Sequence, residues 1–69
     1  MKPRVHQSPE MFLKMVEKLG EPVVATEKIM LMGYMYVTTG TQYIYFAYSA
    51  EPLVIPKGIE VVNAEEVHF

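Results

Sequence analysis

A run of 22 uncharged residues, from Ile29 to Ala50, restricts the fold of this chain more than any other feature. A run of that length is long enough to cross a bilayer as a helix. Its middle, however, is the polar, turn-forming sequence Thr-Thr-Gly-Thr-Gln at 38–42, where a spanning helix would meet the hydrocarbon. β-Branched and aromatic residues on either side favour strands. The run is therefore predicted to form a β-hairpin, with strands at 29–38 and 42–49, and not a membrane span.

The sorting of side chains between two faces predicts the register of this hairpin. A two-residue turn at Gly40-Thr41 has Gly first, as a type II′ turn prefers, and pairs Val37 with Ile44. One face is then aliphatic with a single phenylalanine. The other face, called the tyrosine face below, carries four rings: Tyr34, Tyr36, Tyr43 and Tyr45. A one-residue slip would exchange the faces, so the clean sorting favours this register.

Residues 9–19 have the start signal, the periodicity and the stop signal of a helix. Ser8 can cap the first free amides, and Pro9 suits the first helical position. Apolar side chains then recur at helical spacing, and Gly20 can take the left-handed position that ends a helix. Its apolar arc of roughly 200° is wider than the stripe of a surface helix. The helix is therefore expected to pack deeply into a sheet, on the aliphatic face of the hairpin, or to be shared with a partner.

Shorter patterns complete the expected order of elements. They predict strands at 23–26 and 53–55, a type I turn at 55–58, a last strand at 59–62, a bend at 63–66 and a resumed strand at 67–69. The predicted fold is α+β, with an N-terminal helix packed on a small antiparallel β-meander of four or five short strands. An SH3-like or Sm-like small β-barrel with the helix over one end also fits. The predicted organisation is a single domain at 8–69 behind a flexible N-terminal arm at 1–7.

Few residues of this chain are suited to catalysis. It has no Cys and no Asp, and its two serines are better explained as a helix cap (Ser8) and a strand end (Ser49). The four glycines stand apart, so no phosphate-binding loop is formed. Enzymes usually gather titratable residues in a pocket. We therefore predict no catalytic residue, no cofactor and no enzymatic activity.

One group of residues could begin a metal site. Glu66 and His68 share a side if their segment is a strand, with His6 and Glu65 as companions. A zinc site normally needs three protein ligands, and the third is not evident. The favoured interpretation is a solvated strand face on which Glu and His alternate with buried neighbours, so no metal is predicted. The six methionines are interpreted as core filler.

The tyrosine face has three interpretations. Tyrosine-rich, uncharged surfaces are typical of protein interfaces, which would join two copies or bind another protein. The face could instead be internal core, covered by the C-terminal strand. It could also stack single-stranded nucleic acid, with Lys2 and Arg4 of the arm and with Lys28 and Lys57 nearby. The net charge of −2 disfavours phosphate binding.

The predicted function is that of a small non-enzymatic interaction or assembly protein, as a homo-oligomer or an accessory subunit. This follows from a chain of 69 residues without cysteines, which buries only ~60% of its unfolded surface and lacks disulfides. The alternative is a nucleic-acid-binding module that uses the tyrosine face and the basic arm. The charged N-terminus lacks the apolar run of a secretory signal, so a cytoplasmic location without a membrane is expected. All eight acidic residues are Glu and amides are few, a composition that thermophile proteins favour.

Overall fold

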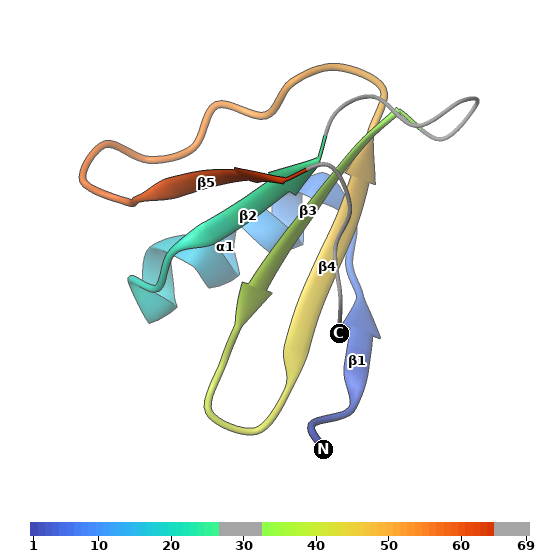
Figure 1. Cartoon of the computed structure of the whole chain (residues 1–69), viewed down its shortest axis with the longest axis vertical. Helices are drawn as coiled ribbons and strands as arrows, with labels where there is room; N and C mark the ends of the chain where they lie inside the picture. The colour runs from blue at the N-terminus through green and yellow to red at the C-terminus, as the bar shows by residue number, and fades with distance from the viewer. Residues whose placement is uncertain (27–32, 65–69) are drawn as a thin grey trace.

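A computed structural model describes residues 1–26 and 33–64 and shows one helix and a five-stranded mixed sheet (Figure 1). The elements are β1 (Arg4–His6), α1 (Pro9–Leu19), β2 (Val23–Thr26), β3 (Tyr34–Thr39), β4 (Ile44–Ser49) and β5 (Val61–Ala64). The strand order is β1-β4-β3-β2-β5, and α1 crosses one face of the sheet. The α+β class is confirmed. Among the described residues β1 and β5 do not pair, so no closed barrel is observed within 1–26 and 33–64.

The helix has the boundaries and the caps predicted for it. The Ser8 Oγ accepts a hydrogen bond from the Met11 N–H at 3.3 Å, and Pro9 occupies the first turn. At the other end Gly20 has φ 69°, and its N–H donates to the Val16 carbonyl oxygen at 2.9 Å. Local sequence therefore sets both ends of α1 through bonds that span three or four residues.

The sheet is mixed, whereas an entirely antiparallel one was expected. β2, β3 and β4 form the expected meander, but β1 lies parallel to β4 and β5 lies parallel to β2. Parallel neighbours need a long crossover connection. The helix connects β1 to β2, and residues 50–60 connect β4 to β5 along the upper side of Figure 1. Each crossover joins two strands that run in the same direction but are not neighbours, so β1 reaches β4 and β5 reaches β2 only after the chain has crossed the sheet. The expectation of a flexible arm at 1–7 is wrong, because Arg4–His6 is an edge strand flanked by hydrogen bonds from Ile44 N–H to Pro3 O and from Gln7 N–H to Phe46 O.

The hairpin has the predicted faces but a different register. Val37 pairs with Phe46, two residues from the expected partner Ile44. The Gly40 N–H donates to the Tyr43 carbonyl oxygen at 2.8 Å, so the chain reverses one residue later than expected, at 41–42. A shift by two residues keeps every side chain on its face, since side chains alternate with period two. Side-chain sorting therefore identified the faces but not the pairing.

The helix packs on the tyrosine face, and the expectation that it covers the aliphatic face is wrong. Phe12 and Val16 of α1 are fully buried, and they form one core cluster with four sheet residues: Val23, Ala25, Tyr36 and Ala47. Ala25 on β2 and Ala47 on β4 are the pairing partners of Tyr36, and their small side chains leave room for the helix. The rings of Phe12 and Tyr36 contact each other with centroids 6.3 Å apart.

Residues 50–60 cross the same face of the sheet without forming the strand predicted at 53–55. Leu53, Ile55 and Ile59 pack against the core cluster, whereas the intervening Val54 is 87% exposed. Inward and outward side chains therefore alternate along 53–55 as in a strand, but the segment pairs with no neighbouring strand among the described residues. Two of the surrounding residues are prolines, which have no N–H to donate to a strand ladder. The turn that follows spans 56–59 and not 55–58. Its Ile59 N–H donates to Pro56 O at 3.3 Å, and Gly58 has φ 94°.

Some sequence predictions fall outside the described residues. They are the first part of the hairpin strand at 29–32, Lys28, Glu65, Glu66, His68 and the strand at 67–69. In the part of the chain that the structure describes, no helix has the length and hydropathy needed to cross a membrane. The last described strand begins at Val61, two residues later than predicted, because Ile59 belongs to the turn and packs inward.

Candidate interaction surfaces

The four tyrosines of the tyrosine face occupy different depths. Tyr36 is 5% exposed and belongs to the core, so it does not lie on an open interaction surface. Tyr34 and Tyr45 are partly buried against the same core. Tyr43, at 40% exposure, is the most accessible of the set, and its ring centroid lies 6.1 Å from that of Tyr45. The structure thus separates the set into a core residue, two supporting residues and one exposed ring, and a binding role for the exposed ring stays a prediction.

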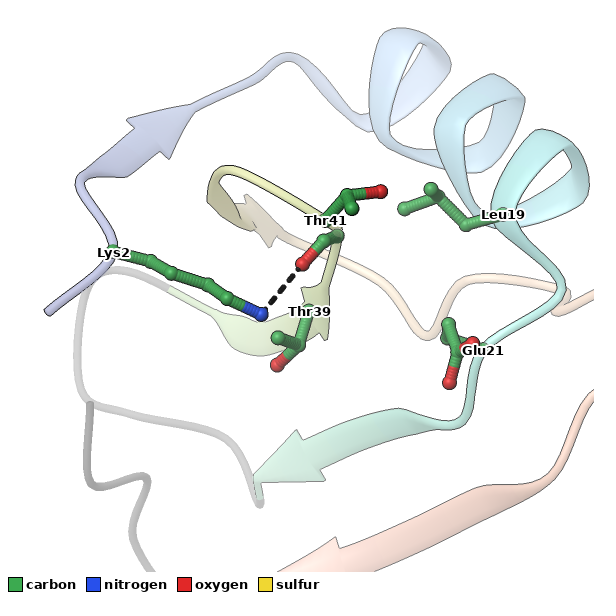
Figure 2. Close-up of a pocket in the computed structure, with 6 residues that line it drawn as sticks. Lys2, Leu19, Glu21, Thr39 and Thr41 are labelled. Carbon is green, nitrogen blue, oxygen red and sulfur yellow. Dashed lines mark hydrogen bonds between the residues drawn. The ribbon is translucent and has the colours of Figure 1, made fainter.

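Two neighbouring hollows lie between the C-terminal half of α1 and the β3–β4 turn. The first, the turn groove, has a volume of about 380 Å³ and is lined by Met15, Lys18, Leu19, Thr41, Gln42, Tyr43 and Tyr45. The second, the Lys2 hollow, has a volume of about 360 Å³ and is lined by Lys2, Leu19, Glu21, Thr39, Gly40 and Thr41 (Figure 2). Leu19 and Thr41 line both, so the hollows adjoin.

Lys2 connects the N-terminal segment to the hairpin turn. Its Nζ donates a hydrogen bond to the Gly40 carbonyl oxygen at 2.8 Å. In Figure 2 the Lys2 side chain extends along one side of the hollow, while Glu21 lies on the other, beyond Thr39. Sequence reasoning placed Lys2 on a mobile arm and so missed this contact, which joins residues 38 positions apart.

The absence of a side chain at Gly40 lets Tyr45 and Leu19 pack closely against the turn between these hollows. A Cβ atom at this position would lie 2.7 Å from Cε2 of Tyr45 and 3.5 Å from a methyl carbon of Leu19. The aromatic ring and the leucine therefore both lie over the glycine backbone. This packing holds the Tyr45 ring beside Tyr43 in the turn groove.

The two edges of the sheet differ in how they are protected. The β1 edge is preceded by Pro3 and carries Arg4, and both residue types discourage pairing with another chain. The four residues of β5, Val-Val-Asn-Ala, carry no charge. Val61 is 43% exposed and Val62 41% exposed. Among the described strands β5 pairs only with β2, so its other edge is a second candidate surface.

His6 lies at the opposite edge, away from both hollows. Its ring stacks on Phe46 with centroids 5.0 Å apart and an interplanar angle of 16°, and it meets the edge of Tyr48. Within residues 1–26 and 33–64 no three His, Cys, Asp or Glu side chains are close enough to hold a metal ion. The companions expected for His6, which are Glu65, Glu66 and His68, lie outside those ranges.

Comparisons with protein families, curated proteins and solved structures give no match to this chain. Its function is therefore inferred from the geometry of the groove and of the sheet edge.

Proposed function

We propose that this chain is a small non-enzymatic assembly protein that pairs with a second copy of itself through the edge strand β5. The observation that carries this proposal is the exposure of Val61 and Val62 on an uncharged strand at the end of the sheet. A strand at a sheet edge presents backbone N–H and C=O groups that another strand can use.

Both sides of this edge are apolar. Val61 pairs with Val23 and so lies on the face covered by α1, whereas Val62 pairs with Val24 and lies on the opposite face. A strand added beside β5 would cover part of each valine. Apolar surface removed from water contributes roughly 25 cal/mol per Å², so this burial adds to the backbone hydrogen bonds.

The difference between the two edges supports pairing at β5. Proline and cationic residues at an edge are common devices against unwanted association, and they occur at β1. The β5 edge has neither within Val61–Ala64. In a chain that must stay monomeric, an exposed edge strand would be expected to carry such a residue.

A second copy is the occupant that this edge fits best. Two β5 strands related by a twofold axis would pair antiparallel and join two five-stranded sheets into one. Within Val61–Ala64 no like charges would face each other across the axis. Association would also supplement the small core that a chain of 69 residues can bury.

Light scattering on the full chain tests this proposal by its solution mass. We expect twice the 7.9 kDa mass of the chain. Val62→Lys would place two like charges close to the twofold axis and should raise the dimer dissociation constant by about tenfold or more, which is about 1.4 kcal/mol. Val54→Lys is the matched control, because Val54 is 87% exposed but lies in the 50–60 crossing.

Two results would overturn the proposal. One is a monomeric mass for the unmodified chain at concentrations of about 100 μM, where a dimer with a dissociation constant of about 1 μM would be largely formed. The other is an equal effect of Val62→Lys and Val54→Lys on the mass. Far-ultraviolet circular dichroism of both variants separates loss of pairing from loss of folding.

A further inference from the structure

Tyr43 and Tyr45 give the turn groove an aromatic wall with one accessible ring. Their centroids are 6.1 Å apart and their planes are inclined by 51°, so the two rings support each other without stacking face to face. Tyr43 is 40% exposed, whereas Tyr45 is partly buried over Gly40. An exposed ring held by a second ring is suited to stack on a flat, unpaired base.

The remaining lining of the turn groove combines apolar and polar groups. Met15 and Leu19 supply apolar contact from α1, while Gln42 supplies an amide that can both donate and accept hydrogen bonds. Lys18 is the charged residue of this lining, and among the described residues no carboxylate takes part in it. The groove therefore fits a ligand with a flat ring, hydrogen-bonding edges and a negative group.

The adjoining Lys2 hollow supplies a second cation. The Lys2 ammonium gives one hydrogen bond to the Gly40 carbonyl oxygen, and an ammonium group has three donors. It can therefore still donate to a phosphate oxygen. The two hollows share Leu19 and Thr41 in their linings, so Lys18 and Lys2 lie in adjoining hollows beside the turn.

We infer that the turn groove and the Lys2 hollow together bind single-stranded nucleic acid. An unpaired base stacks on Tyr43, with Gln42 beside its edge. The phosphates that follow lie near Lys18 and Lys2. None of these residues belongs to β5. Nucleic-acid binding at this site and the proposed pairing of two copies can therefore be tested independently of each other.

Charge distinguishes this ligand from a proline-rich peptide, which also docks on aromatic grooves. Lysines on both hollows favour a chain with repeated negative charges. The affinity is limited by the net charge of −2, by Glu21 in the Lys2 hollow and by the partial negative charge at the C-terminal end of α1. Weak binding with a clear dependence on salt is therefore expected.

Fluorescence anisotropy with labelled oligo-dT and oligo-rU of about eight nucleotides tests the inference on the full chain. Two lysine–phosphate contacts predict that the logarithm of the binding constant falls against that of the salt concentration with a slope of about −1.4. Free uridine monophosphate and inorganic phosphate are the comparison ligands, and both should bind more weakly than the oligomers.

Substitutions in the groove identify the contacts. Tyr43→Ala should weaken oligomer binding by about tenfold or more, while Tyr43→Phe, which keeps the ring, should bind within about twofold of the unmodified chain. Lys18→Ala should weaken binding and reduce the salt slope by about 0.7. Lys57→Ala makes the same change of charge at an exposed turn away from the groove and should leave the affinity unchanged.

Four results would overturn the inference. They are no oligomer binding at low salt, equal losses from Lys18→Ala and Lys57→Ala, uridine monophosphate binding as tightly as the oligomers, or binding of a proline-rich peptide in place of them. Circular dichroism of each variant checks its fold. Tyr43 lies outside the core cluster, so its substitution should not unfold the chain.

Discussion

The backbone N–H of Leu53 donates a hydrogen bond to the phenolic oxygen of Tyr36 at 2.9 Å. This bond ties the 50–60 crossing to the central strand β3, across 17 positions of sequence. Residues 50–60 form no strand, and apart from the Glu60 carbonyl oxygen, which accepts a hydrogen bond from the Val23 N–H, side-chain contacts hold them on the sheet. Tyr36 therefore anchors the crossing that brings β5 beside β2.

Removing the Tyr36 hydroxyl should weaken this anchor without changing the core volume. Tyr36→Phe keeps the ring but leaves the partly buried Leu53 N–H without its acceptor, which costs about 1–3 kcal/mol of unfolding free energy. Urea titration followed by circular dichroism measures this loss. The matched variant Tyr43→Phe removes a hydroxyl from an exposed ring and should change stability by less than about 0.5 kcal/mol. Equal effects of the two variants would contradict the anchoring role.

Gly33 has a structural requirement that Gly58 lacks. Both have positive φ, 82° and 94°, but a Cβ at Gly33 would overlap the Ser49 carbonyl oxygen, whereas one at Gly58 meets nothing within 4 Å. Gly33→Ala should therefore cost about 3 kcal/mol or more, from strain together with overlap. Gly58→Ala should cost only the backbone strain, about 1–2 kcal/mol. Thermal unfolding of both variants compares them, and an equal loss of Tm would show that the close approach of Gly33 to Ser49 is not required.

Phe12 and Met11 are adjacent on α1 but differ in burial. Phe12 is fully buried against Tyr36, whereas Met11 is 50% exposed. Phe12→Ala should cost about 3–5 kcal/mol and unfold much of the population of a domain this small. Met11→Ala should change stability by less than about 0.5 kcal/mol. Urea titration measures both, and a large effect at Met11 would indicate that the outer side of α1 is covered in solution.

Pairing through β5 should make the stability of the chain depend on its concentration. Binding that stabilises only the folded state raises Tm as concentration increases. We expect this dependence for the unmodified chain and for Val54→Lys, and its loss in Val62→Lys. Differential scanning calorimetry over about a hundredfold range of concentration measures it. A Tm independent of concentration in all three proteins would argue against the pairing.

Local patterns in the sequence predicted the elements that depend on near neighbours. The Ser8 cap bonds to Met11, three residues away, and Gly20 bonds back to Val16, so both ends of α1 could be predicted from a short stretch. The faces of the hairpin could also be predicted, since alternation depends only on the pleat. Its pairing could not, because a shift of two residues preserves the same faces.

The candidate site was predictable only in part. Tyr43 and Tyr45 were singled out by their residue type and alternation, but nothing in that pattern separates them from Tyr36, which is buried. The difference arises because α1 and the 50–60 crossing cover one end of the face and leave the turn uncovered. Lys2 enters the site through a hydrogen bond to Gly40, and no local pattern predicts a contact between such distant residues.

The α+β class, the helix with its two caps and the two-sided hairpin could all be predicted from the sequence, because each depends on interactions within a few residues or on strand alternation. Long-range packing alone places the helix on the tyrosine face, β1 parallel to β4 and β5 parallel to β2. Those choices depend on how Phe12 and Val16 fit against the small residues Ala25 and Ala47, and on crossover connections that bring distant strands together. The uncharged run from Ile29 to Ala50 thus supplies two central strands, whose burial depends on residues outside the run.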